Sequence, residues 1–265
     1  MSMVQKETAI RLITAFILLP LLVVIWFGGM TALMLSLIFV LFMSGELALS
    51  ARGHRLDLTT LIITAAIAMP LMLSLTARHM GFDPAALYMA GTLMAIAIVF
   101  IGLFSFRHIS GLVMMILLTV LGLSLIELLG LDDGGVWLVL GLVTIACVDT
   151  MGFVVGRRIG GVKLWPAISP AKTWSGAIGG IVFSPLAFLI YLILSGGDVV
   201  LALLALPLGV VAIAGDLIES WYKRSHSLKD IGRLLPGHGG LLDRFDGSLL
   251  ALPLLYLMLD KGWLG

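Results

Sequence analysis

Charged residues are concentrated in one stretch of the sequence, Gly215–Asp246, which follows a long apolar run. Five acids and five bases lie there, whereas only 12% of all 265 residues are charged. They are Asp216, Glu219, Lys223, Arg224, Lys229, Asp230, Arg233, Asp243, Arg244 and Asp246. A turn of Pro236-Gly237-His238-Gly239-Gly240 separates the acids at the two ends. Such a concentration in an apolar chain predicts a polar site.

Carboxylates at both ends of this stretch suit a divalent cation. If the preceding helix continues through Glu219, then Asp216, Glu219 and Lys223 recur at helical spacing and share one face. Asp243 and Asp246 are expected to do the same at the start of the following helix. A few hard oxygen ligands, with room for water and phosphate oxygens, are typical of a Mg²⁺ site. We therefore expect Mg²⁺ and leave a second cation open.

Basic residues close to these acids indicate a substrate that carries phosphate. An ammonium neutralises phosphate oxygens and a guanidinium can bind two at once, and the residues of this kind are Lys223, Arg224, Lys229 and Arg233. For Lys229, Asp230 and Arg233, an ordinary solvated loop explains the charge equally well. For Asp216 it explains less, because an acid that follows an apolar run needs a partner or a function.

Three other acids and one histidine call for an interpretation. Asp149 lies late in an apolar run and invites the same argument as Asp216. For Glu46 a structural role and a functional role are equally expected, and Glu127 is less expected to be functional because it falls near the outer surface. His238 can serve as a base, but a histidine in a glycine turn more often anchors the loop by hydrogen bonds, which is the role we favour.

Long apolar runs must position these side chains. The chain is 60% hydrophobic and has a mean hydropathy of +1.16. Runs able to cross ~30 Å of hydrocarbon exclude a soluble globule, and the absence of alternating hydrophobicity excludes a membrane barrel. We expect an all-α, polytopic membrane protein, because a helix satisfies its own backbone in lipid. Its nine expected spans are Leu12–Phe27, Met30–Leu49, Leu58–Leu75, Ala85–Phe104, Ile109–Leu129, Val136–Gly156, Trp174–Leu194, Val199–Ile218 and Ser248–Leu259.

The basic residues orient these spans. With the amino terminus in the cytoplasm and the first run retained as a span, 14 of the 16 Lys and Arg residues fall in inside segments, and only Arg78 and Lys261 fall outside. Cytoplasmic loops carry such an excess of positive charge. The two long polar segments, Arg157–Thr173 and Ser220–Gly247, then lie on the cytoplasmic side and can build one site.

The chain has no linker, repeat or low-complexity tract that would divide it. We expect a single integral-membrane domain, 1–265, in which 1–135 forms amino-terminal spans and 136–265 the catalytic part. Close helix contacts in membranes use small residues at regular spacing, and such residues are Gly152, Gly156, Gly176 and Gly180. The single cysteine, Cys147, excludes an intrachain disulfide.

Two groups of motifs resemble a known family. Ser220–Arg224, Lys229-Asp230 and Pro236–Asp246 resemble, with the spacing kept, the signature of phosphatidate cytidylyltransferases, also called CDP-diacylglycerol synthases. Asp149–Arg157, Lys163-Leu164 and Ser169–Trp174 are similar to the family's other cytoplasmic motif. The resemblance covers the carboxy-terminal half. Ala171 replaces a second lysine of many members, and Tyr222 replaces an aliphatic residue or Phe; we expect Trp221 and Tyr222 to be interfacial anchors.

The resemblance implies transfer of CMP from CTP to phosphatidic acid, with release of pyrophosphate. It implies metal ligation by Asp216, Asp243, Glu219 and Asp149, of which Asp216 and Asp243 are the leading candidates. Asp246 and Glu219 are expected at the metal or directly behind its ligands. It implies catalytic roles for Lys223, Arg224 and Asp246. It implies binding of CTP by Ser169, Lys172, Thr173, Lys229 and His238. The expected partners are CTP, phosphatidic acid and membrane lipids but no nucleic acid, and a homodimer is left open. The expected location is a bacterial inner membrane, with the site facing the cytoplasm.

Two other functions are carried as alternatives. A cytidylyltransferase for another lipid phosphate has the same motifs. An ion-coupled transporter could use Asp149 and Asp216 to bind its coupling ion. The transporter is disfavoured because the polar residues cluster at one membrane face, and no inverted repeat is apparent.

Overall fold

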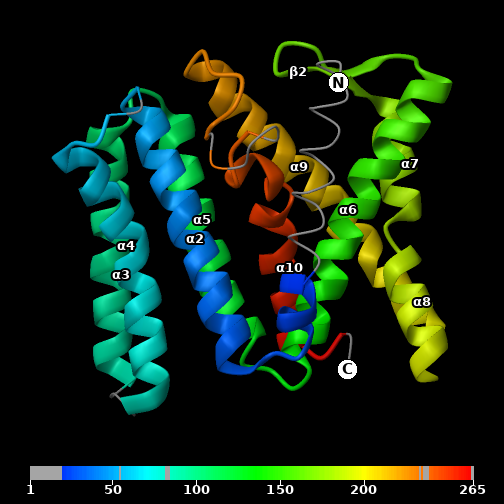
Figure 1. Cartoon of the computed structure of the whole chain (residues 1–265), viewed down its shortest axis with the longest axis horizontal. Helices are drawn as coiled ribbons and strands as arrows, with labels where there is room; N and C mark the ends of the chain where they lie inside the picture. Colours follow the sequence, from blue (N-terminus) through cyan, green and yellow to red (C-terminus); the bar gives the residue numbers. More distant parts are fainter. Residues whose placement is uncertain (1–19, 54, 81–83, 233, 235–238, 264–265) are drawn as a thin grey trace, which may run out of the picture. The chain divides into compact units, whose positions relative to one another are not determined.

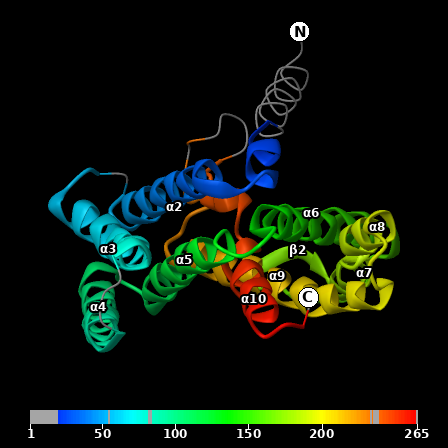
Figure 2. The same cartoon turned by 90° about the horizontal axis from the view of Figure 1, so that it is seen from below.

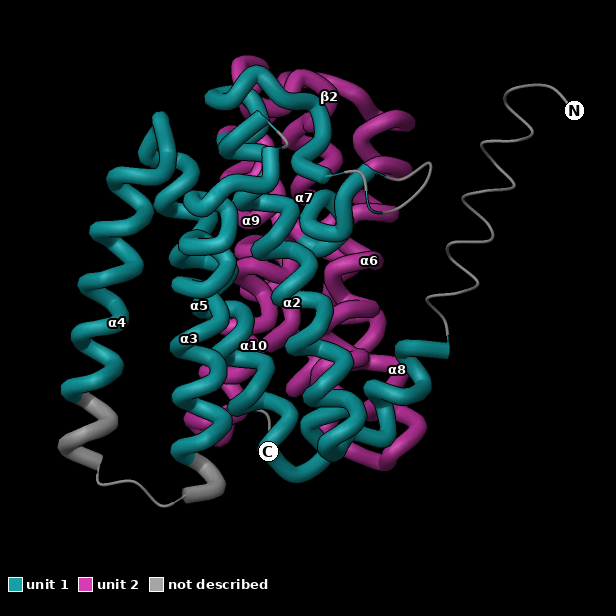
Figure 3. The backbone as a smooth tube through the Cα atoms, turned by 60° about the vertical axis from the view of Figure 1, so that its left-hand side comes forward, with its two compact units in different colours: residues 1–135, 222–245 teal, residues 136–221, 246–265 magenta. Residues whose placement is uncertain are grey.

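The computed structural model describes residues 20–53, 55–80, 84–232, 234 and 239–263 (Figure 1). Arg233 and His238, two of the expected site residues, lie outside the described part. Contacts between residues divide the chain into two compact units, which Figure 3 shows in two colours. Unit 1 comprises Met1–Gly135 and Tyr222–Phe245, and unit 2 comprises Val136–Trp221 and Asp246–Gly265.

The described part of unit 1 contains four long helices and the segment that follows α9. The helices are α2 (Gly29–Ala51), α3 (Leu58–Met80), α4 (Pro84–Ser105) and α5 (Ile109–Leu128). Helix α3 packs against α2, α4 and α5, and α4 also packs against α5 (Figures 1 and 2). Residues without solvent exposure, such as Leu47, Ile67 and Met114, form its core. The loop segment contains a short 3₁₀ turn, η2 (Leu242–Arg244).

Unit 2 contains most of α6 (Gly134–Ile159) and of α9 (Ala205–Ser225), together with the elements between them and α10 (Ser248–Asp260). Those between them are β1 (Lys163–Trp165), β2 (Ser169–Thr173), α7 (Trp174–Phe183), α8 (Leu186–Ser195) and the 3₁₀ helix η1 (Val199–Leu204). The two strands pair antiparallel, with Lys163 opposite Thr173. This small hairpin is the part of the described structure that departs from the expected all-α fold.

The long apolar helices confirm a helical membrane protein. Within the described residues, six helical segments are long and apolar enough to span a membrane: Gly29–Ala51, Leu58–Ala77, Ile109–Leu128, Gly134–Ile159, Trp174–Ser195 and Val199–Ser225. Met89–Ser105 and Ser248–Asp260 are apolar but shorter. Half of the expected first span, Leu12–Phe27, lies outside the described part. The count of nine spans therefore stays a prediction.

Two expected spans differ in detail from the helices observed. The run Trp174–Leu194 is divided at Pro185, which precedes α8 and has no backbone N–H to continue α7. The run Val199–Ile218 begins as the 3₁₀ helix η1, and α9 then continues to Ser225, past the expected end. The extension matters because it keeps Glu219 and Lys223 on the same helix as Asp216.

The glycines of α6 and α7 confirm the expected close helix contact. A Cβ at Gly176 would lie 3.2 Å from the Cα of Gly156, and one at Gly180 would lie 2.7 Å from the carbonyl oxygen of Val148. Only glycine permits backbones to approach this closely without displacement. The hairpin that follows α6 is therefore attached to a tightly packed helix pair.

Candidate active site

Three carboxylates come together in unit 2. Asp216 and Glu219 project from α9, and Asp246 lies two residues before α10. One oxygen of each carboxylate lies within 4.8 Å of the others, and Glu219 is fully buried. Oxygens this close suit a hard divalent cation such as Mg²⁺, which carboxylates bind together with water or phosphate oxygens.

The electrostatics of Asp246 fit such a site. Burial raises the pKa of this carboxyl well above its usual range, and the neighbouring Asp216 and Asp149 raise it further. The backbone N–H of Gly247, 2.6 Å from Asp246 Oδ1, and the charge of Lys172 act in the opposite direction. Like charges held together disfavour ionisation, and a bound cation would offset that repulsion.

Lys172 contributes a positive charge beside the acids. Its ammonium forms an ion pair with Asp216 Oδ2, and about a quarter of its side chain, 26%, remains exposed. The hairpin positions it, because Lys172 lies on β2 and β2 leads directly into α7. Ser169 begins the same strand and is partly exposed. Both residues thus occupy the polar segment that was expected to bind phosphates.

Thr173 has a structural task in the same strand. Its hydroxyl oxygen accepts a hydrogen bond from the backbone N–H of Gly176 at 3.1 Å, which caps the amino terminus of α7. The side chain is buried at 7% exposure. Direct CTP binding by Thr173 stays a prediction, whereas the helix cap is observed.

Small residues allow the three carboxylates to meet. A Cβ at Gly215 would lie 2.6 Å from the carbonyl oxygen of Asp246, so a side chain at this position of α9 would displace the segment that carries Asp246. A Cβ at Gly247 would lie 2.9 Å from Ile145. The glycines on either side of the acids therefore belong to the site, although the sequence did not single them out.

In unit 1, the carboxylate of Asp243 binds backbone amides. It accepts hydrogen bonds from the N–H groups of Ile231 and Gly240, both at 2.9 Å, and a longer one from Gly232 at 3.3 Å. Lys223 Nζ lies 3.1 Å from its Oδ1. These contacts hold two separate parts of the loop against one side chain. Metal ligation by Asp243 stays a prediction, and an ion there would compete with these donors.

Glu46, on α2, also accepts hydrogen bonds from backbone amides of this loop. Its Oε2 accepts a hydrogen bond from the backbone N–H of Leu242 at 2.9 Å, and its Oε1 accepts one from Leu234 at 3.3 Å. The residue is 7% exposed. We call the paired carboxylates of Glu46 and Asp243, with the loop amides that they bind, the loop clasp. The sequence left the role of Glu46 open, because its partners are far away along the chain.

Gly240, the last residue of the glycine turn, lies against the loop clasp. A Cβ at Gly240 would lie 2.8 Å from an oxygen of Asp243, 2.8 Å from an oxygen of Glu46 and 2.7 Å from the backbone nitrogen of Gly232. A side chain there would therefore push both carboxylates away from the amides. Gly239 has φ +84, in the left-handed region that glycine adopts without strain.

The remaining expected residues have different surroundings. Lys223 binds Asp243, as described, whereas Arg224 is exposed and its Nη1 donates to the carbonyl oxygen of Leu228 at 3.4 Å. Lys229 is exposed on the loop. Tyr222 was expected to be an interfacial anchor, and this was wrong. It has no solvent exposure, and its hydroxyl lies 2.7 Å from the hydroxyl of Ser50.

The grouping of the acids differs from the expected one in one respect. Asp216 and Glu219 were expected to share a face and do so, but the third carboxylate of their group is Asp246. Asp243 and Asp246 do not share a helix face, because η2 ends at Arg244 and α10 begins only at Ser248. Asp149, on α6, lies outside the group of three and acts on Asp246 through its charge.

Comparison with protein families gives a match over nearly the whole chain. Residues 9–261 match the model described as the cytidylyltransferase family. The match includes α2 to α10, the three carboxylates of unit 2 and the two carboxylates of the loop clasp.

Individual relatives match over shorter stretches. The chain is 40% identical over 131 residues to a phosphatidate cytidylyltransferase of Staphylococcus haemolyticus, covering 48% of this chain and 50% of that protein. It is 50% identical over 111 residues to one of Brucella abortus, covering 41% of each chain. A third, of Staphylococcus epidermidis, is 46% identical over 114 residues, covering 42% of this chain and 44% of that protein. The matched stretches thus span about half of these relatives or less.

Proposed function

Because the chain belongs to the cytidylyltransferase family, we propose that it transfers CMP from CTP to phosphatidic acid and forms CDP-diacylglycerol. A phosphate oxygen of phosphatidic acid attacks the α-phosphorus of CTP. The bond from that phosphorus to the oxygen bridging the β-phosphate breaks, and pyrophosphate leaves. The names of the relatives support this choice of substrates.

The observation that carries the proposal is the group of three carboxylates with a lysine beside it. Asp216, Glu219 and Asp246 offer oxygens within 4.8 Å of one another, and Lys172 is ion-paired to the first of them. The attacking phosphate monoester is already anionic near neutral pH, since its second pKa is about 6. The reaction therefore needs positive charge and positioning more than a base.

These residues fit Mg²⁺. Their oxygens are hard ligands, and the pKa of Asp246 is raised by burial and, in addition, by the negative charges of Asp216 and Asp149, which a cation would balance. When bound, a divalent ion supplies positive charge for the phosphate oxygens of CTP. Asp216, Glu219 and Asp246 would hold it, and Asp149, whose charge acts on Asp246, is a further candidate ligand. Asp243 keeps the loop in shape and is the alternative ligand.

Basic residues bind the phosphates in this proposal. Lys172 is ion-paired to Asp216 and partly exposed, so its ammonium can reach a phosphate oxygen while it stays near the acids. Ser169 lies on the same strand and donates a hydrogen bond to CTP. Lys223 and Arg224 bind the phosphate groups from the end of α9, and Lys229 does so from the segment that follows. His238, outside the described residues, is expected to bind CTP as well. Arginine is suited to gripping two phosphate oxygens.

The proposed location is a bacterial inner membrane with the site open to the cytoplasm. The excess of Lys and Arg in the segments assigned to that side supports this orientation. CTP is a charged nucleotide and would reach the site from water, whereas phosphatidic acid would enter sideways from the inner leaflet.

Reconstituted protein with labelled CTP and Mg²⁺ tests the proposal. Offered a panel of lipid phosphates, it should transfer label to phosphatidic acid, and removal of metal by EDTA should abolish the transfer. Lys172→Ala should lower the rate by roughly 10²–10³-fold, the usual effect of losing one charge-stabilising donor. Lys163→Ala is the matched control, because this exposed lysine of β1 donates a hydrogen bond to the backbone carbonyl oxygen of Ala171 at 3.3 Å. Transfer that persists in EDTA, or that prefers a polyprenyl phosphate, would refute the proposal.

A further inference from the structure

Lys172 contacts an acid that the proposed divalent ion also needs. Its ammonium forms an ion pair with Asp216 Oδ2, and its positive charge also acts on Asp246. Both acids belong to the group of three carboxylates whose oxygens lie within 4.8 Å of one another. The ammonium therefore supplies to these two acids the same kind of charge that a divalent ion would supply.

Both carboxylate oxygens of Asp216 have a partner. Oδ2 is paired with Lys172, and Oδ1 accepts a hydrogen bond from the hydroxyl of Ser220 at 3.3 Å. A hydroxyl is neutral and leaves a lone pair of Oδ1 for a metal ion, so Ser220 can stay in place. Two cations on one carboxylate repel each other, and only 20% of the Asp216 side chain is exposed to water that would screen them. Lys172 and a divalent ion thus compete for Asp216.

The side chain of Lys172 can change its partner while the backbone stays in place. The next residue, Thr173, is fixed because its hydroxyl caps α7, and Ser175 Oγ donates to the carbonyl oxygen of Gly160 at 2.5 Å. These bonds hold the base of the hairpin. The lysine itself has a flexible carbon stem, and 26% of its side chain is exposed. Rotation of the stem is therefore enough to move the ammonium away from Asp216.

A bound nucleotide offers the ammonium a new partner. Phosphate oxygens accept strong, charge-assisted hydrogen bonds from an ammonium. Lys172 is already beside the acids at which the phosphates of CTP are proposed to meet the divalent ion. One side chain can thus serve the carboxylate and the phosphate in turn.

We propose that Lys172 leaves Asp216 when a divalent ion binds the acids, and that its ammonium then binds a phosphate of CTP. The proposal rests on the proposed function, because it takes CTP and a divalent ion as the ligands of this site. It gives Lys172 opposite effects on the two ligands. The lysine competes with the metal ion and assists the nucleotide.

Binding of Mn²⁺ to the reconstituted full-length protein, measured by electron paramagnetic resonance without CTP or lipid, tests the competition. Lys172→Met keeps the unbranched stem but removes the charge, so it should tighten Mn²⁺ binding by about tenfold or more. Lys172→Gln should do the same and replaces it if the methionine variant does not fold. Lys172→Arg keeps the charge and should resemble the wild type. Lys163→Met removes an exposed charge from the neighbouring strand and should change the affinity by less than about twofold.

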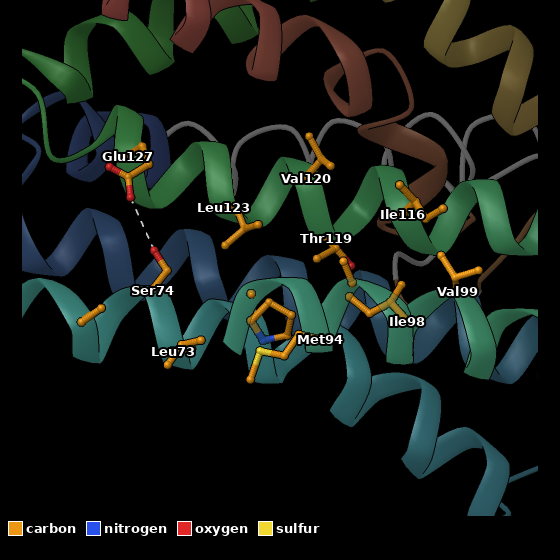
Figure 4. A pocket seen from close by; sticks show the side chains of 14 residues that line it. Leu73, Ser74, Met94, Ile98, Val99, Ile116, Thr119, Val120, Leu123 and Glu127 are labelled. Atoms are coloured by element: carbon orange, nitrogen blue, oxygen red, sulfur yellow. Dashed lines mark hydrogen bonds between the residues drawn. The ribbon is translucent and has the colours of Figure 1, made fainter. Parts of the chain in front are cut away.

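Asp216→Asn tests whether Asp216 is the ligand for which the two cations compete. It should weaken Mn²⁺ binding, and Lys172→Met added to it should then give only a small part of the gain seen in the wild-type background. Glu127→Gln is the control for the loss of an acid. Glu127 lies on α5 in unit 1, where Ser74 donates to it (Figure 4), and it is not one of the three grouped acids. It should leave Mn²⁺ binding unchanged.

Calorimetric titration with CTP tests the second part of the exchange. With Mg²⁺ present and lipid left out, no transfer occurs and binding alone is measured. Lys172→Met should weaken CTP binding by about tenfold or more, since it removes a charge-assisted hydrogen bond. Lys163→Met should bind CTP as the wild type does.

Unchanged or weaker Mn²⁺ binding in Lys172→Met would overturn the proposal, because the lysine would then not compete with the ion. A gain that persists in full in Asp216→Asn would also overturn it, since the lysine would then act without Asp216. Unchanged CTP binding would exclude the phosphate as the second partner. None of these measurements uses the transfer reaction. Protein that behaves as expected in all of them but transfers no CMP would refute the proposed function alone.

Discussion

Removal of the Glu46 charge should open the loop between Lys229 and Asp243. Glu46→Gln keeps the length and shape of the side chain, but its amide offers one acceptor oxygen where the carboxylate offers two. Since Glu46 receives N–H groups from both Leu234 and Leu242, one of these donors would face the NH₂ group of glutamine. The variant thus converts a hydrogen bond into a contact between two donors.

The expected cost follows from these two bonds. A hydrogen bond to a charged group contributes about 1.5–3 kcal/mol, and an unsatisfied buried donor costs about 1–3 kcal/mol. Since one of the two bonds survives, we expect a local destabilisation of roughly 2–4 kcal/mol. At 1.4 kcal/mol per factor of ten, this raises the exchange rate of the Leu242 amide by roughly 30- to 700-fold.

Hydrogen exchange measured on peptides from the loop provides the assay, with CMP transfer measured on the same samples. Glu127→Gln is the matched control, because it removes a glutamate charge from another helix of unit 1 without touching the loop clasp. Exchange should rise in the loop of Glu46→Gln and stay unchanged in that of Glu127→Gln, and transfer should fall with the loop. Unchanged exchange in Glu46→Gln would show that the two bonds do not hold the loop.

Three further outcomes are expected. Asp243→Asn should weaken the loop clasp and accelerate exchange of its amides; a loss of transfer with normal exchange would instead favour the metal role. Ser227→Cys, in a Cys147→Ser background, should react with an impermeant thiol reagent only from the cytoplasmic side, and labelling from outside sealed cells would contradict the proposed orientation. In EDTA, the wild type should lose stability relative to Asp246→Asn as the pH rises above about 4, because a carboxyl whose pKa is raised by folding is harder to ionise in the folded state. Melting curves that stay parallel across pH would contradict the raised pKa of Asp246, which burial and the nearby acids cause, and added Mg²⁺ should reduce the difference.

Within regular helices, sequence spacing was sufficient to predict neighbours. Asp216 and Glu219 are three apart, and α9 is continuous through both, so their shared face followed from helix geometry alone. The close contact between α6 and α7 through their regularly spaced glycines was predicted for the same reason. The membrane class followed from composition, because long apolar runs leave few alternatives to spanning helices.

Sequence spacing did not predict which side chains are neighbours where the backbone is not helical. Asp243 and Asp246 are also three apart, but the turn at η2 gives them different partners: Asp243 binds loop amides, whereas Asp246 joins Asp216 and Glu219. The burial of Tyr222 was missed likewise, because it depends on neighbours supplied by packing. The break at Pro185 has a local cause, the missing backbone N–H of proline, which the expectation of one continuous span did not take into account.

The sequence by itself determined that the chain is a helical membrane protein, that its charges gather in a few segments and that acids on α9 share a face. Only the tertiary structure decided that Asp246 completes the acidic group and that Glu46 binds the loop. Glu46 and Leu242 are 196 residues apart, and no local pattern encodes a contact at that separation. Periodicity reports neighbours along one helix, whereas a carboxylate from another helix meets a loop amide only after the helices have packed.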